Sequence, residues 1–95
     1  MNPKIRTEAV DHLFEAILQL KDKEECYKFF EDLMTIKELE SISQRWQVAK
    51  MLDNGCTYAE IAEKTKASAA TISRVNKCLS YGADGYSMML RKLKK

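Results

Sequence analysis

The stretch that decides the fold is Thr57–Val75, which reads TYAEIAEKTKASAATISRV. It opens with Thr57 and Glu60, which have the spacing of a capping box at the start of a helix, and Ser68 is a second N-cap residue. The pattern predicts a short helix over 58–65, a brief turn and a second helix. Such a helix-turn-helix is typical of proteins that place the second helix in the major groove of DNA.

Apolar residues inside this stretch predict how its two helices pack. Ile61, Ile72 and Val75 would fill the wedge between the helices, and the small side chain of Ala62 would let them approach closely. Lys66 stands where such turns most often have glycine, because a left-handed backbone costs a larger residue on the order of 1 kcal/mol. The sequence therefore leaves open a turn of different geometry, and an ordinary helical hairpin in a small α-domain also fits the pattern.

Short and basic side chains mark the surface that this motif would offer to DNA. The first turn of the second helix presents short side chains, which let its backbone come close to base edges, while nearby cations could reach phosphates. The candidate DNA-binding residues are Lys64, Lys66, Ser68, Ala69, Ala70, Thr71, Ser73, Arg74 and Lys77. We expect three of them to face bases, namely Ala69, Thr71 and Ser73. We expect three others to meet the DNA backbone, namely Lys64, Lys66 and Lys77.

Amphipathic patterns outside the motif predict the remaining helices. They are expected over 4–20, 22–34 and 35–55, with a last basic turn or two around 88–93. N-caps are expected at Asp22 and Thr35, and helix ends at Gly55 and at Gly82, just after Tyr81. The fold class is therefore all-α, with about six helices.

Length and composition restrict this fold to one small domain. The 95 residues include three Gly and one Pro, which are too few for the many tight turns of a β-sandwich or barrel. A chain of this size buries only about 60–65% of the surface of its unfolded form, so a partner subunit would help to stabilise it. We expect a single domain over 1–95 that consists of dimerisation helices (1–56), a helix-turn-helix (57–81) and a C-terminal helix (82–95).

Several classes of protein are disfavoured by what the sequence does not contain. No apolar run approaches the roughly 18 residues of a membrane span, and the charged start MNPKIRTEAVDH is unlike a signal peptide, so we expect a cytoplasmic protein without a membrane partner. The three cysteines lack a CxxC pair and are expected to be reduced thiols. His12 is the only histidine, which argues against a catalytic triad or a metal site. The sequence predicts neither an enzyme nor a cofactor-dependent protein.

The charge distribution favours the C-terminal half as the surface for a polyanion. The net charge is only +2, but residues 57–82 hold four basic against two acidic side chains and residues 83–95 hold four against one. Double-stranded DNA would bind such a region, since cations that neutralise phosphates release counterions. An ordinary solvated surface explains the same charges nearly as well.

The pattern AxxATISR at 67–74 resembles the recognition-helix signature of the Trp repressor superfamily. The segments ELESISQRWQVAKML, GCTYAEIAEKTKASAATISRV and LSYGADGY more closely resemble its YerC/YecD group across positions 38–86. The resemblance implies an all-helical homodimer in which the N-terminal helices of two subunits interlock. Two helix-turn-helix heads would then remain exposed for DNA.

The resemblance also implies a ligand pocket. The threonine and two arginines that contact tryptophan in the Trp repressor align with Thr35, Arg45 and Arg74. Guanidinium groups bind carboxylates bidentately, so these residues suit an amino-acid-like effector. Val75 replaces a small glycine of the family and would crowd an indole ring, which argues against tryptophan itself. Alternatively, the arginines could bind phosphates or pair with carboxylates such as Glu38 and Glu40.

Two functional hypotheses follow from these patterns. The first is a sequence-specific, homodimeric transcriptional regulator, acting as a repressor through its helix-turn-helix under the control of a small ligand. The alternative is a helical protein-interaction module without DNA binding, in which aromatic and methionine side chains contact a partner protein, among them Phe29, Phe30 and Trp46. Each of these aromatic residues also fits a core position, and Trp46 is expected to pack against the first helix.

Overall fold

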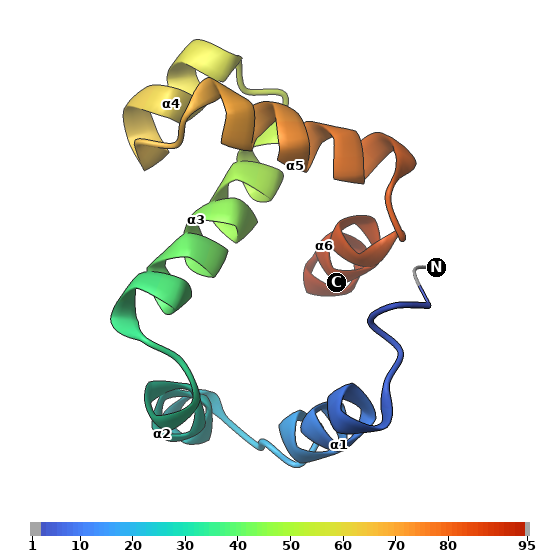
Figure 1. Ribbon diagram of the computed structural model, residues 1–95. Coiled ribbons are helices and arrows are strands. Elements are labelled where there is room, and N and C mark those ends of the chain that lie inside the picture. The colour runs from blue at the N-terminus through green and yellow to red at the C-terminus, as the bar shows by residue number, and fades with distance from the viewer. Residues whose placement is uncertain (1–2, 95) are drawn as a thin grey trace. The chain divides into compact units, whose positions relative to one another are not determined.

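The computed structural model describes residues 3–94 and shows six α-helices there and no strand (Figure 1). The helices are α1 (Glu8–Ile17), α2 (Lys23–Leu33), α3 (Ile36–Asp53), α4 (Tyr58–Thr65), α5 (Ala69–Tyr81) and α6 (Gly85–Leu93). The prediction of an all-α fold with about six helices is confirmed. The chain divides into two compact units, 1–36 and 37–95, so the boundary expected at residue 56 falls inside the second unit.

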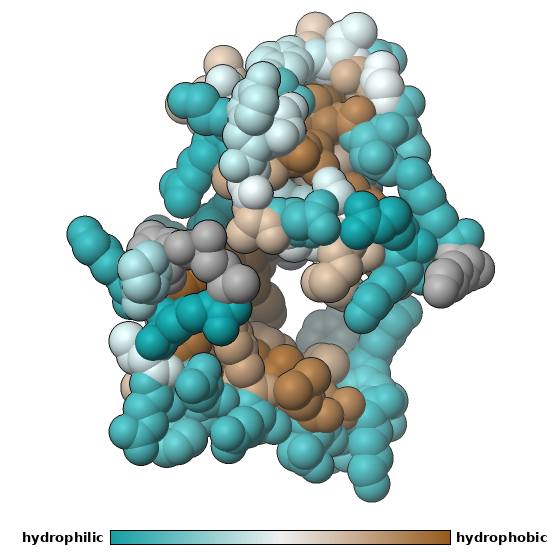
Figure 2. All heavy atoms as spheres, turned by 90° about the vertical axis from the view of Figure 1, so that its right-hand side faces the viewer, coloured by the Kyte–Doolittle hydropathy of each residue, from teal (hydrophilic) through white to brown (hydrophobic). Residues whose placement is uncertain are grey.

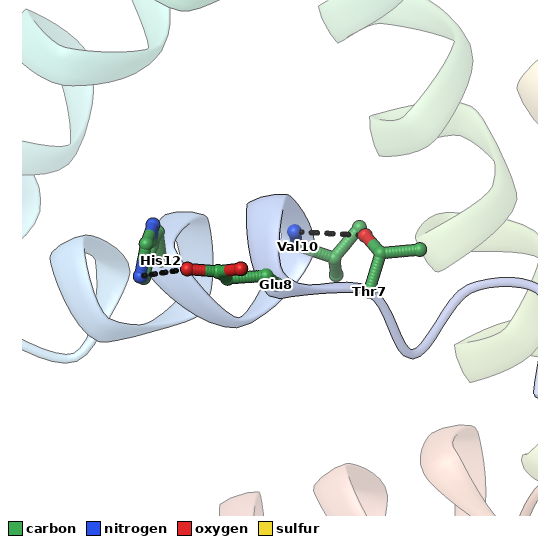
Figure 3. A network of polar contacts seen from close by, with 4 residues as sticks. All are labelled: Thr7, Glu8, Val10 and His12. Carbon is green, nitrogen blue, oxygen red and sulfur yellow. Dashed lines mark hydrogen bonds and ion pairs between the residues drawn. The ribbon is translucent and has the colours of Figure 1, made fainter.

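Helix α1 begins later than its apolar pattern predicts. Thr7 has an extended backbone, and its hydroxyl accepts a hydrogen bond from the backbone N–H of Val10 at 3.2 Å (Figure 3). This is an N-cap, which stops the helix from extending back to Lys4. In the first turns of the helix, His12 Nε2 lies 3.9 Å from a carboxylate oxygen of Glu8, and both side chains are exposed.

Helix α2 begins at the predicted N-cap, with one difference from a capping box. The carboxylate of Asp22 accepts the backbone N–H of Glu25 at 2.9 Å. The side chain of Glu25 reaches back to the N–H of Lys21, one residue before the cap. Neither α1 nor α2 contains a buried residue. The described part of the first unit therefore consists of two capped amphipathic helices without a core of their own.

Helix α3 ends at Gly55, as the sequence predicts. Gly55 has a φ of +81°, which is the left-handed conformation favoured after a helix. Its N–H donates to the carbonyl of Leu52, and the N–H of Cys56 donates to the carbonyl of Met51, both at 3.0 Å. These two bonds form a Schellman motif, which satisfies the last carbonyls of α3 and turns the chain into α4.

The core of the second unit lies where α3, α4 and α5 meet. The predicted wedge of Ile61, Ile72 and Val75 is confirmed, since all three side chains are at most 1% exposed. From α3 the core receives Val48 and Ala49, two consecutive residues that one amphipathic stripe would not bury together. The cause is that α3 is covered on more than one side, so a single-stripe pattern underestimates its buried face.

Helix α5 ends at Tyr81 and is followed by Gly82, as the sequence predicts. The backbone of Gly82 is extended, with a φ of −82° and a ψ of −157°, rather than left-handed. Glycine is needed for a steric reason, because a Cβ atom at this position would lie 2.4 Å from the carbonyl oxygen of Cys78. Glycine is therefore required after α5 because the backbone of Cys78 lies too close for a side chain at position 82.

Helix α6 packs on α3, within the second unit, through contacts near both of its ends. Near its start, Tyr86 stacks on Trp46 of α3, with ring centroids 6.3 Å apart. Trp46 is half-buried, and Tyr86 is its aromatic neighbour. Leu90 is buried, and beyond it Lys94 donates to a carboxylate oxygen of Asp53 at 2.6 Å. These contacts attach α6 to α3.

Candidate nucleic-acid interface

The first helix of the motif, α4, starts with the predicted capping box. The backbone N–H of Glu60 donates to the hydroxyl of Thr57 at 3.1 Å, and the N–H of Thr57 donates to the carboxylate of Glu60 at 2.8 Å. The bond from the Thr57 backbone is the main reason that the pKa of the Glu60 carboxyl lies below its usual value. The start of α4 is therefore fixed by two reciprocal bonds.

The turn between α4 and α5 adopts the left-handed conformation that the sequence left open. Lys66 has a φ of +61° and a ψ of +15°, and its N–H donates to the carbonyl of Ala62 at 2.9 Å. This is the single-bond αL ending of a helix, here with a lysine in place of the usual glycine. The helix-turn-helix thus forms with ordinary geometry around an unfavourable residue.

Thr65 is the centre of the hydrogen bonds that hold this turn. Its hydroxyl donates to the carbonyl of Ile61 at 2.8 Å and accepts the N–H of Ala67 at 3.1 Å. Its own carbonyl accepts a bond at 3.0 Å from the side-chain amide of Gln44 on α3. Ala67, next in the chain, is 5% exposed and belongs to the core. The turn is therefore fixed from within and from α3 (Figure 1).

Helix α5 starts at the predicted cap, which also involves one of the candidate base contacts. Ser68 accepts the backbone N–H of Thr71, and the two hydroxyl oxygens lie 3.1 Å apart. Thr71 is half-buried, and its hydroxyl already has a partner in the cap. The hydroxyl of Thr71 is therefore engaged within the motif, where it helps to fix the start of α5.

The solvent face of α5 combines short side chains with basic ones. Ala70, Ser73, Arg74 and Lys77 recur at the spacing of one helix face, opposite the buried Ile72. The structure leaves eight of the nine candidate DNA-binding residues exposed: Lys64, Lys66, Ser68, Ala69, Ala70, Ser73, Arg74 and Lys77. They lie on α4, the turn and the first three turns of α5, so the structure brings them together on one motif.

The first turn of α5 differs in charge from those of the helices before it. Acidic residues occupy the first turns of α1, α2, α3 and α4, whereas the first turn of α5 contains none. An acidic side chain there would interact favourably with the positive end of the helix and would repel phosphates. The start of α5 is therefore electrostatically compatible with a polyanion.

The three residues expected to bind a ligand are distributed over both units. Thr35 is exposed and directly precedes α3 in the first unit, whereas Arg45 and Arg74 belong to the second. Arg45 is half-buried and donates to the hydroxyl of Ser41 at 3.2 Å. Arg74 is exposed on α5, and its neighbour Val75 packs in the core, where it is 1% exposed.

Two grooves border the C-terminal half of α5. A small one of about 240 Å³ belongs to the solvent face and is lined by Arg74, Lys77, Cys78, Tyr81 and Gly82. A larger apolar groove of about 470 Å³ lies toward α6 and is lined by Trp46, Cys78, Ala83, Gly85, Tyr86, Met88 and Met89. A groove with two basic side chains and a larger apolar groove thus both border α5.

Residues 3–94 contain no group of three or more His, Cys, Asp or Glu side chains placed to hold a metal ion. In the same residues no helix is long and apolar enough to cross a membrane.

Sequence reasoning missed the polar contacts that position the motif. Gln44 lies on the helix before the motif, and nothing in its neighbours indicates that it reaches the turn 21 residues later. Thr65 reads as an ordinary helix-end residue, although it carries three hydrogen bonds of the turn. The only local signal for such a turn is weak: a threonine at the end of a short capped helix, whose hydroxyl can bond to nearby backbone groups.

The fold and this surface define the chain as a helix-turn-helix protein of the regulatory kind, built on a DNA-binding fold and not on that of an enzyme family. The sequence pattern of the family described as Trp repressor protein matches residues 8–94. The chain belongs to the Trp repressor family.

The chain is similar to proteins of several bacteria. The chain is 55% identical to the uncharacterized protein YerC of Bacillus subtilis over 96% of its own length and 88% of the relative's. A TrpR like protein from Eubacterium eligens is 58% identical and has a TM-score of 0.94, with 98% of this chain and 96% of that chain covered. A putative Trp repressor from Staphylococcus aureus is 52% identical and has a TM-score of 0.93, with 97% and 92% covered.

Proposed function

We propose that this protein is a cytoplasmic transcriptional repressor that binds double-stranded DNA sequence-specifically as a homodimer. The observation that carries the proposal is the solvent face of α5, where Ala70 and Ser73 are followed by Arg74 and Lys77. Short side chains at the start of a helix allow close approach to base edges, and cations one turn further can contact phosphates. The family to which the chain belongs supports this proposal.

A homodimer is supported by the apolar side chains that the helices leave exposed. In the first unit Phe14 is 53% exposed and Leu18 is 80% exposed, although both side chains are large and apolar. Figure 2 shows hydrophobic residues at the surface among hydrophilic ones. Exposed patches of this kind mark interaction surfaces, and a second copy would supply the core that α1 and α2 lack.

Two dimer-related heads would read a palindromic site. Helix-turn-helix dimers bind half-sites about 34 Å apart, which places both reading helices on one side of the duplex. We therefore expect specific binding to depend on both half-sites and on the dimer. Substituting Leu18→Glu, which puts a charge on the apolar face of α1, should lower the molar mass in multi-angle light scattering and weaken binding to a two-half-site duplex together.

A small amino-acid-like ligand is the effector that the available side chains would suit. Arg45 is half-buried next to a neutral hydroxyl, so its guanidinium could still bind a carboxylate bidentately. The resemblance aligns Arg45, Arg74 and Thr35 with the three residues that contact tryptophan in the Trp repressor. Since Val75 stands where the family has a small glycine, a ligand smaller than tryptophan is expected, and a thermal-shift series of free amino acids tests this.

The test of DNA binding is fluorescence anisotropy with duplex DNA at about 50 and about 200 mM salt, followed by selection of a preferred sequence. Ser73→Asp and Ala70→Asp should abolish binding, because each places a carboxylate on the reading face. Ser80→Asp is the matched control, with the same new charge on the same helix two turns further on, and it should bind much better. Unchanged sequence-specific binding by both reading-face variants would exclude α5 as the reading helix.

One observation favours the protein-interaction module as a second candidate function. The apolar groove between α5 and α6 contains aromatic and methionine side chains that suit a partner helix. If the wild-type protein binds no duplex at low salt, with or without amino acids, and Met89→Asp removes a stoichiometric protein partner, this second candidate replaces the first.

A further inference from the structure

We infer that Lys66 is a DNA-positioning residue whose charge contributes to DNA affinity while its backbone conformation destabilises the fold. The inference rests on the proposed function. It goes beyond that function because it assigns one side chain opposite effects on binding and on stability. The observation behind it is a lysine where the geometry of the turn favours glycine.

The backbone of Lys66 is unfavourable for any residue with a Cβ atom. Its φ of +61° lies in the left-handed region, and within residues 3–94 only one other non-glycine residue, Asp84, has a positive φ. Glycine adopts this conformation without a steric cost, whereas lysine has no side-chain group that bonds locally to offset it. A glycine at position 66 should therefore give a more stable protein.

The hydrogen bonds of the turn do not use the Lys66 side chain. They join the Lys66 N–H to Ala62, the Thr65 hydroxyl to Ile61 and Ala67, and the Gln44 amide to the Thr65 carbonyl. All of them would remain with glycine at position 66, because each uses backbone atoms or another side chain. The fold thus imposes the left-handed conformation and gains no hydrogen bond or ion pair from the lysine side chain.

The ammonium group of Lys66 is free to meet a ligand. The side chain is exposed, and the structure gives it no hydrogen bond or ion pair with residues 3–94. It extends from the turn that joins α4 to the reading helix, two residues after the exposed Lys64 and two before the Ser68 cap. A flexible cation at this point can contact a backbone phosphate beside the base pairs that α5 would read.

The experiment compares Lys66→Gly with two variants that separate charge from backbone. Lys66→Arg keeps the charge and the left-handed backbone. Asp84→Gly relieves the other left-handed position, with a φ of +70°, outside the helix-turn-helix, and its ion pair with Arg91 is solvent-exposed. Each protein is tested for urea unfolding at fixed concentration, and for duplex binding across a salt series.

We expect Lys66→Gly to lower the unfolding equilibrium constant roughly two- to fivefold. Its DNA affinity should fall roughly eightfold per protomer at 0.1 M salt, and the slope of log K against log salt should shrink by about 0.9 per protomer. Lys66→Arg should match the wild type in both assays. Asp84→Gly should be stabilised, with the salt slope of the wild type.

Two results overturn the inference alone: wild-type affinity and salt slope in Lys66→Gly, or a Lys66→Gly protein that is no more stable than the wild type. A wild-type protein that binds no duplex at about 50 mM salt, with or without amino acids, overturns the proposed function, and the inference with it.

Discussion

The two units of the chain differ in whether they have a hydrophobic core that can stabilise them without a partner. Residues 37–95 contain a core whose central side chains, among them Val48, Ile61 and Ile72, are at most 1% exposed. None of the described residues of the first unit is buried, and its helices have caps but no core. Caps define where a helix begins, but burial of apolar surface provides most of the stability of a packed helix. The second unit is therefore expected to fold on its own core, and the first to depend on a partner.

The largest expected effect comes from truncating one apolar residue in each unit. Ile61→Ala should lower the free energy of unfolding by about 2–5 kcal/mol, because it removes buried methyl groups and leaves a cavity. Phe14→Ala should have an effect that depends on protein concentration, since the contacts of Phe14 would lie in the dimer. Thermal unfolding at several concentrations distinguishes the two. An equally large, concentration-independent loss in Phe14→Ala would show that the first unit has a core of its own.

The same comparison explains how far the sequence predicts the fold. Helix positions, the caps at Asp22, Thr57 and Ser68, and the end of α3 at Gly55 could be predicted because each depends on residues within one or two turns. The start of α1 was predicted four residues early, because an apolar pattern fades gradually while the Thr7 cap ends the helix sharply. Local chemistry therefore predicts helix ends better than periodicity does.

Contacts between residues far apart in the sequence limit how much of the candidate site the sequence can predict. All nine candidate DNA-binding residues could be placed on one motif, because the helix-turn-helix is local in sequence. The bond between Gln44 and Thr65 joins residues 21 positions apart, and the stacking of Trp46 on Tyr86 joins residues even further apart. No periodicity or capping rule encodes such pairs, so they became visible only in the folded chain.

A substitution of intermediate effect tests how tightly the second unit is packed at the end of α5. Gly82→Ala should lower the free energy of unfolding by about 1–3 kcal/mol, because the new methyl group would lie within 2.4 Å of a backbone oxygen that cannot move freely. Gly85→Ala, three residues later, meets nothing within 4 Å and should be neutral or stabilising by up to about 1 kcal/mol. Urea unfolding measures both. Equal effects at the two positions would contradict the packing described for α5.

A smaller effect is expected from the bond that ties the turn to α3. Gln44→Ala removes the side-chain partner of the Thr65 carbonyl and should cost about 1–2 kcal/mol. Gln47→Ala is the control, since Gln47 is also a half-buried glutamine of α3 and takes no part in the bonds of the turn. If both variants unfold at the same urea concentration, the bond does not hold the motif on α3.

The smallest effect concerns the pH dependence of the second unit. The hydrogen bond from the Thr57 backbone lowers the pKa of the exposed Glu60 carboxyl in the folded protein, so the ionised form is favoured there more than in the unfolded chain. Its contribution to stability is complete above the usual glutamate pKa of about 4.3 and is lost as the pH falls below that value through the lowered pKa. Glu60→Gln should therefore be less stable than the wild type at pH 7, with the difference disappearing as the pH falls through the lowered pKa. Denaturant unfolding at each pH measures this, and a difference that is constant with pH would mean that the carboxylate charge adds nothing to the cap.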